Sequence, residues 1–128
     1  MTENELATVA IDICFVIHRE FGPGLLESVY ESAFVYELSQ RNISFTRQEG
    51  IKVFYRGVNM DLGFRADLIL ENKFLIELKS VEYLEKVHHK RVITYLKLKG
   101  IKLGLLVNFN VELIKEGIHR KIWGQISE

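Results

Sequence analysis

The fold is decided by residues 63–79, whose sequence is GFRADLILENKFLIELK. Two apolar segments joined by a short polar connection predict a β-hairpin. Three charged side chains interrupt these segments, Asp67 in the first strand and Glu77 and Lys79 in the second. Because side chains alternate across a strand, Glu77 and Lys79 share one face of the predicted hairpin. A carboxylate and an ammonium group therefore project together from its second strand.

The length of the connection decides whether Asp67 joins them, because directly opposed residues of an antiparallel pair point to the same face. A three-residue loop at 71–73 pairs Asp67 with Glu77, whereas a two-residue loop puts them on opposite faces. With the longer loop, two carboxylates and a lysine converge in a way that suits Mg²⁺ and a substrate phosphate. The alternative is a solvated hairpin face that carries an ion pair, since the pattern D-x9-E-x-K is loose.

Length and composition indicate a single domain over residues 1–128. The chain is 48% hydrophobic and 27% charged, as globular proteins are, and its one proline leaves no obvious linker. No apolar run approaches the roughly 18 residues of a membrane span, so we expect a soluble, cytoplasmic protein with no membrane partner. The single cysteine, Cys14, excludes an internal disulfide and supports no zinc site.

Charge is balanced overall but unevenly distributed. The net charge is zero, which argues against strong non-specific attraction of the whole molecule to nucleic acid. The first 37 residues hold seven acids and one base, whereas residues 86–110 hold six bases and no acid. The basic segment is either a local phosphate-binding surface or the solvated face of a helix.

Hydrophobic periodicity along the chain predicts helices and strands that together form an α/β fold, of the α+β kind with a mixed sheet. The predicted helices cover residues 3–20, 25–40 and 85–99, and the predicted strands cover residues 43–55, 63–70, 74–79, 103–109 and 115–123. Residues 103–109 are apolar without interruption, which indicates a strand inside the sheet. The predicted order is helix, helix, strand, strand, strand, helix, strand, strand, in a central mixed sheet flanked by helices.

Helical spacing places several polar residues beside the predicted core. The buried side of the second helix is predicted to contain Leu26, Val29, Tyr30, Ala33 and Phe34. Glu27 lies at the edge of that side and is expected to be partly buried, although an acid there also complements the helix dipole. In the third helix, Arg91 and Tyr95 lie one turn apart beside the core face, within reach of a site at its border. Lys90 and Lys97 face away from the core.

The element order, with an acid in the second strand and Glu-x-Lys in the third, resembles that of the PD-(D/E)XK nuclease superfamily, which has the restriction-endonuclease-like fold. Residues 24–30, GLLESVY, are also similar to the Gly-x-x-Glu-x-x-Tyr signature of the GxxExxY family within that superfamily. Segments at 65–68, 77–79, 94–97 and 104–109 resemble further blocks of the same family. The resemblance covers roughly residues 6–123.

This resemblance implies a site for Mg²⁺ or Mn²⁺ formed by Asp67, Glu77 and the backbone carbonyl of Leu78. Lys79 would orient the attacking water and offset charge that builds on the phosphate. Glu27 looks like the extra acid that some branches of the superfamily add to the metal site. Tyr95 is similar to the tyrosine of the superfamily's Gln-x-x-x-Tyr helix motif.

The sequence departs from the superfamily pattern at two positions. Arg91 stands where the helix motif has glutamine, and it brings a cation next to the expected metal site. Ala66 stands where the superfamily's name has a proline. The first departure bears on the substrate or on activity itself, while the second is usual in the superfamily.

Two functions from different classes follow. The first is a metal-dependent phosphodiesterase that acts on nucleic acid, with DNA as the expected substrate, and in which Lys90 and Lys97 bind phosphates. The second is a non-catalytic module for binding nucleic acid or protein, which Arg91, the zero net charge and the small size favour. The sequence does not distinguish DNA from RNA as the substrate or internal from terminal cleavage. It also leaves the oligomeric state open, and a homodimer is possible. Titration with Mg²⁺ and Mn²⁺ separates the two functions.

Overall fold

A computed structural model describes residues 1–60 and 63–126 of the chain. The elements are α1 (Glu3–Phe21), α2 (Glu27–Gln40), β1 (Phe45–Ile51), β2 (Phe54–Tyr55), β3 (Val58–Asn59), β4 (Phe64–Leu70), β5 (Phe74–Lys79), α3 (Lys86–Lys99), β6 (Leu103–Asn108), a short 3₁₀ helix η1 (Ile114–Glu116) and β7 (Ile118–Ile122). Within these described residues, no helix combines the length and the apolar character needed to cross a membrane.

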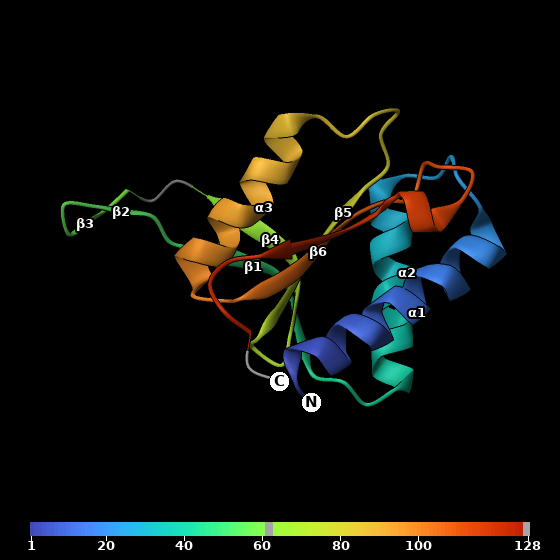
Figure 1. Cartoon of the computed structure of the whole chain (residues 1–128), viewed down its shortest axis with the longest axis horizontal. Helices are drawn as coiled ribbons and strands as arrows, with labels where there is room; N and C mark the ends of the chain where they lie inside the picture. The colour runs from blue at the N-terminus through green and yellow to red at the C-terminus, as the bar shows by residue number, and fades with distance from the viewer. Residues whose placement is uncertain (61–62, 127–128) are drawn as a thin grey trace.

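Five strands form one mixed sheet in the order β1-β4-β5-β6-β7. Neighbouring strands are antiparallel except β5 and β6, which run parallel and are connected through α3. Helices α1 and α2 pack on one face of this sheet and α3 on the other (Figure 1). The mixed sheet flanked by helices confirms the predicted fold class.

Each face of the sheet has its own apolar cluster. The larger one joins α1 and α2 to β4, β5 and β6 through residues such as Ile13, Phe34, Leu68 and Leu105. The smaller one lies under α3 and contains Tyr95, Leu96, Ile69, Leu75 and Leu106. Strand β6 contributes to both clusters and is buried along its whole length, as its uninterrupted apolar sequence predicts.

Local sequence signals explain where the helices begin and end. Thr2 and Glu5 form a reciprocal capping box at the start of α1, since each side chain accepts the backbone N–H of the other residue. Helix α3 ends at Gly100, whose φ of 69° lies in the left-handed region that glycine adopts readily. The predicted helix boundaries agree with these ends to within about two residues, which is the usual uncertainty of assignment.

The prediction is wrong for the strand over residues 43–55 and for the buried side of α2. The expected strand over residues 43–55 ends at Ile51, and residues 54–59 form a separate two-stranded hairpin, β2–β3. In addition, Leu26 is 74% exposed because it precedes the first turn of α2, and Val29 is exposed as well. The buried side of α2 consists of Tyr30, Glu31, Phe34 and Leu38.

Candidate active site

Strands β4 and β5 separate at Asp67 and Glu77. The loop between them has three residues, 71–73, and the register pairs Leu70 with Phe74 and Leu68 with Ile76. The same register sets Asp67 opposite Glu77, but the backbone ladder has ended there. The Asp67 N–H instead donates to Glu77 Oε1 over 2.9 Å, and the Leu78 N–H donates to Asp67 Oδ2 over 2.8 Å. Two carboxylates thus occupy the positions of ladder carbonyls between the two strands.

The faces of β4 invert at Asp67. Residues two positions apart on a regular strand point to the same face. Here, however, Ala66 packs in the cluster under α3 and Leu68 packs in the cluster under α1 and α2. Strand β1 is irregular at the same level, since Gln48, which the register sets opposite Asp67, has a φ of 55°. The irregularity turns the Asp67 carboxylate toward β5 and away from either apolar cluster.

Gln48 holds Asp67 from the other side. Its Nε2 group donates to Asp67 Oδ1 over 3.0 Å and to Glu31 Oε1 over 2.7 Å. Glu31 is only 8% exposed and accepts a second, charge-assisted hydrogen bond of 2.6 Å from Arg47 Nε. A chain of polar contacts therefore runs from α2 through β1 to the carboxylate of Asp67.

Sequence reasoning missed both Glu31 and Gln48. Glu31 lies one helical turn after Glu27, between the buried residues Tyr30 and Phe34, and an acid at such a position is a usable signal. Gln48 carries no comparable signal, because its role depends on a backbone conformation that glutamine seldom adopts.

Burial and mutual repulsion control the protonation of the two acids. Burial is the main cause that raises the pKa of Glu77 to about 8, and the charge of Asp67 adds to it. Burial also raises the pKa of Asp67, against the hydrogen bonds from Leu78 and Gln48, which favour the ionised form. Glu77 is 5% exposed and therefore gains little from water. The nearby positive charges of Lys79 and Arg91 lower the pKa of Glu77 without offsetting burial, and a bound cation would add positive charge to the pair.

Lys79 lies on β5 two residues after Glu77 and is half-buried. Alternation places both side chains on one face, as predicted, and the positive charge of Lys79 lowers the pKa of both acids. The strand is fixed just beyond this point by Asn108, whose side chain accepts the Val81 N–H over 3.1 Å and donates to the Val81 carbonyl over 2.9 Å. The chain that leaves the site is therefore held in place.

Helix α3 brings two of the predicted residues to the same site. Tyr95 is buried, in the apolar cluster and not beside it, and burial followed by the charge of Glu77 raises its pKa. Arg91 is exposed one turn earlier, and its charge lowers the pKa of Glu77. Lys90 and Lys97 are exposed on α3, and phosphate binding by them stays a prediction.

A model of the PD-(D/E)XK nuclease superfamily matches residues 4–121. The chain belongs to this superfamily. Searches among curated proteins and among solved structures gave no match. The members of this superfamily are nucleases, which generally depend on divalent metal ions.

The loop before α2 carries the predicted Gly-x-x-Glu-x-x-Tyr pattern. Gly24 has a φ of 101°, which a side chain would strain. Tyr30 is fully buried, stacks on Phe109 at 4.4 Å between ring centroids, and donates its hydroxyl to the Gly22 carbonyl over 2.6 Å. The same hydroxyl accepts the Leu25 N–H over 3.2 Å. The glycine and the tyrosine of the pattern thus shape the loop that leads into Glu27.

Glu27 is the first residue of α2 and lies beside the end of β5. Its side chain is exposed, so the expectation of partial burial is wrong. Its Oε2 accepts the Ser80 N–H over 3.4 Å, and the Ser80 hydroxyl donates to the Leu25 carbonyl over 2.6 Å. The acid therefore sits beside the residue that follows Lys79. A contact between Glu27 and the Asp67–Glu77 pair stays a prediction.

The oxygen atoms around Asp67 fit a hard divalent cation by their chemistry. Among residues 1–60 and 63–126, no three His, Cys, Asp or Glu side chains lie close enough together to hold a metal ion. Two carboxylates are present, however, and the N–H of Leu78 points at Asp67. Since the N–H and C=O of one residue in a strand point toward the same neighbouring strand, the Leu78 carbonyl is oriented toward this gap too. The residues fit Mg²⁺ or Mn²⁺.

We expect Gln48→Asn to raise the pKa of Asp67. Asparagine tolerates the positive φ of this position but is one methylene too short to bridge Glu31 and Asp67. Loss of the hydrogen bond removes a contact that favours the ionised carboxylate. An NMR titration of the Asp67 carboxyl in both proteins measures the effect. Gln48→Gly, which allows the positive φ but removes the whole side chain, should give the same shift. An unchanged titration of Asp67 in both variants would exclude the role of Gln48 as a bridge between Glu31 and Asp67.

Proposed function

We propose that this protein is a nuclease that hydrolyses phosphodiester bonds of nucleic acid, with DNA as substrate, and that it requires Mg²⁺ or Mn²⁺. The observation that carries the proposal is the pair of the half-buried Asp67 and the buried Glu77 in the gap between β4 and β5, where burial and then the charge of Asp67 raise the pKa of Glu77 to about 8. Two carboxylates this close repel each other when both are ionised, and a divalent cation held between them would offset that repulsion. The Glu-x-Lys spacing adds an ammonium group on the same face.

In this proposal Asp67, Glu77 and the Leu78 carbonyl hold the cation. The cation, when bound, supplies Lewis acidity to a phosphoryl oxygen and lowers the pKa of a coordinated water. Lys79 holds the attacking water in line and stabilises the negative charge that develops on the phosphate. Arg91, exposed near Glu77, binds a phosphate oxygen of the substrate, for which its planar guanidinium is well suited.

We further propose that the chain belongs to the GxxExxY branch and that Glu27 assists the metal site. The position of Glu27 at the end of β5, held by Ser80, supports this assignment. So does the structural use of Gly24 and Tyr30, which explains why a glycine and a tyrosine flank the acid at these distances. Lys90 and Lys97 would extend phosphate binding along α3.

The experiment that tests this function is a cleavage assay on linear and circular DNA and on RNA, each with Mg²⁺, Mn²⁺ or a chelator. We expect cleavage of DNA with either cation and none with the chelator. Lys79→Met should lower the rate by roughly 10²- to 10³-fold, because it removes charge that acts on the transition state. Cation binding by this variant, measured by calorimetry, should stay close to that of the unchanged protein. A Lys79→Met protein that cleaves at the full rate would contradict the role given to Lys79.

Arg91 favours a second function, a non-catalytic nucleic-acid-binding module that retains the fold. The guanidinium already lowers the pKa of Glu77, and it occupies the position where the superfamily motif has glutamine. A permanent cation beside the acids would compete with a metal ion. The two functions differ in one measurement: calorimetric titration with Mn²⁺ should show saturable binding that Asp67→Asn abolishes if the first is right, and no binding if the second is right.

A further inference from the structure

The β2–β3 hairpin projects from the main sheet and exposes aromatic residues. It connects the end of β1 to the start of β4 and reaches away from the body of the molecule (Figure 1). Phe54 is 59% exposed and Tyr55 62%, and the register pairs Tyr55 with Val58 and Phe54 with Asn59. Because side chains alternate across a strand, each face of the hairpin carries one aromatic ring. No apolar cluster of the described core includes these rings.

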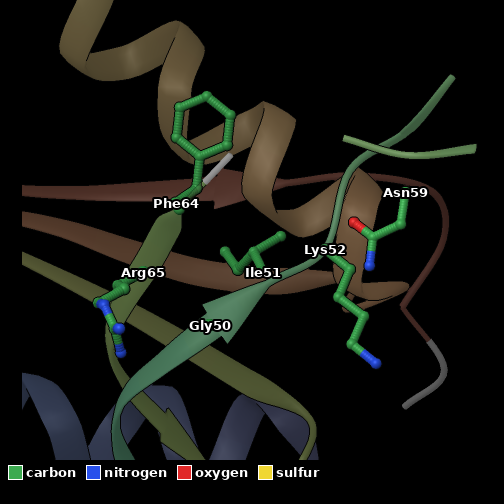
Figure 2. A pocket seen from close by; sticks show the side chains of 7 residues that line it. Gly50, Ile51, Lys52, Asn59, Phe64 and Arg65 are labelled. Carbon is green, nitrogen blue, oxygen red and sulfur yellow. The ribbon is translucent and has the colours of Figure 1, made fainter. Parts of the chain in front are cut away.

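A pocket of about 230 Å³ opens where the hairpin joins the sheet. Among residues 1–60 and 63–126, its walls contain two cations and no acid, and they consist of Gly50, Ile51, Lys52, Asn59, Gly63, Phe64 and Arg65. A Cβ atom at Gly50 or at Gly63 would meet no other atom within 4 Å, so the backbone there is accessible. Lys52 and Arg65 lie on either side of the end of β1, while the ring of Phe64 points toward α3 (Figure 2).

This pocket is connected to the candidate active site through two direct contacts. Arg65 Nη1 donates to the Gln48 carbonyl over 3.1 Å, and the side chain of Gln48 holds Asp67. On the α3 side, the centroids of the Phe64 and Tyr95 rings lie 5.6 Å apart, and the pKa of Tyr95 is raised by burial and then by the charge of Glu77. A nucleic-acid strand that leaves the site along β4 therefore meets this pocket first and the hairpin next.

We propose that the pocket and the hairpin bind a single-stranded segment of nucleic acid that continues from the cleavage site. The inference rests on the proposed function and names the form of substrate that this site takes. Lys52 and Arg65 bind backbone phosphates, and Tyr55 and Phe54 stack on bases. Base stacking on aromatic rings beside a positively charged groove is the usual way in which proteins bind single strands without reading their sequence. Arg56, 5.6 Å from the centre of the Tyr55 ring, adds a further positive charge.

Charge favours nucleic acid over a second copy of this chain as the occupant. Two copies packed through this surface would bring Lys52, Arg56 and Arg65 of one molecule close to the same three cations of the other. Like charges at an interface repel, whereas a phosphate backbone carries the opposite charge. A self-association surface is therefore the outcome that the experiment must exclude.

The test compares two DNA probes in the absence of divalent cations, a blunt duplex and the same duplex with a single-stranded tail. We expect the unchanged protein to bind the tailed duplex about tenfold more tightly, as fluorescence anisotropy measures it. Tyr55→Ser and Phe54→Ser should each reduce this advantage several-fold, because a base loses its stacking partner. The matched control is Tyr36→Ser on α2, since Tyr36 is 61% exposed and lies outside both the pocket and the hairpin.

A second pair of variants tests the phosphate contact. Lys52→Ala should lower the slope of log affinity against log salt by about one, whereas Lys115→Ala in η1 should leave it unchanged. Arg65 is not a suitable variant, because it also bonds Gln48.

The outcomes separate this inference from the proposed function. Two results would overturn this inference alone, provided that the unchanged protein shows metal-dependent cleavage. One is equal affinity for the two probes, and the other is hairpin variants that bind the tailed duplex as tightly as the control variant does. A protein that neither binds nor cleaves DNA or RNA would overturn the proposed function and this inference with it. A dimer in sedimentation that Tyr55→Ser converts to a monomer would assign the surface to self-association and overturn the inference.

Discussion

Asp67→Asn is expected to abolish metal-dependent cleavage, with a loss of at least about 10³-fold. The asparagine side chain has nearly the shape of aspartate and still has an oxygen that can accept the Leu78 N–H. It lacks the negative charge that a divalent cation requires from this position. The initial rate of cleavage of a labelled DNA substrate in saturating Mg²⁺ measures the loss.

Unfolding does not account for such a loss. Asp67 belongs to neither apolar cluster, and its removal relieves repulsion with Glu77, which is part of the cause of that acid's raised pKa. The thermal midpoint of the metal-free variant should therefore stay close to that of the unchanged protein, because relief of this repulsion offsets the loss of the hydrogen bond from Gln48. Asp12→Asn is the matched control, since this acid pairs with Arg41 at 2.8 Å on the surface of α1. Full activity of Asp67→Asn would remove the central element of the proposed site.

The β4–β5 hairpin could be predicted from the sequence because its signals are local. Apolar residues flank a three-residue polar loop, and the loop length alone sets Asp67 opposite Glu77. The interior position of β6 follows equally directly from its continuous apolar sequence. Register therefore predicts that the two acids lie opposite each other, whereas the turn of the Asp67 carboxylate toward β5 depends on the irregular backbone at this level.

The β2–β3 hairpin could not be predicted in the same way. Phe54 and Tyr55 continue the apolar alternation of β1, so periodicity alone extends the strand through them. The chain turns instead at Arg56 and Gly57, whose φ values of 51° and 79° are those of a two-residue hairpin loop. The sequence predicts a turn over residues 56–59, but strands of two residues each are too short to show an alternation of their own.

The polar network around Asp67 was beyond sequence reasoning for a different reason. Glu31 is buried because Arg47 and Gln48, from a strand 16 and 17 residues later, supply its hydrogen bonds. Burial of a charge depends on partners that only the tertiary fold brings together. Exposure of Leu26 has a simpler cause, since α2 begins at Glu27, two residues later than expected, and Leu26 therefore precedes its first turn.

Glu77→Gln is expected to stabilise the metal-free protein at alkaline pH by roughly 3–5 kcal/mol. The pKa of Glu77 is about 8 in the folded protein, against an ordinary value of 4.5. Between these two values the unfolded chain releases the proton while the folded protein retains it, so stability falls as pH rises and the loss is complete above pH 8. Glutamine cannot ionise, and its oxygen can still accept the Asp67 N–H.

Urea unfolding at pH 5, 7 and 9 measures this effect. The unchanged protein should lose stability from pH 5 to pH 9, and Glu77→Gln should lose much less, while Glu112→Gln on the exposed surface should follow the unchanged protein. Addition of Mg²⁺ at pH 9 should restore stability to the unchanged protein only, because a cation that binds the folded state stabilises it. Equal pH dependence in Glu77→Gln and the unchanged protein would show that Glu77 is not a buried acid with a raised pKa. In such a site the acids lower the stability of the metal-free fold, and the cation that activity requires restores it. Glu77→Gln measures how much of this loss of stability comes from one side chain.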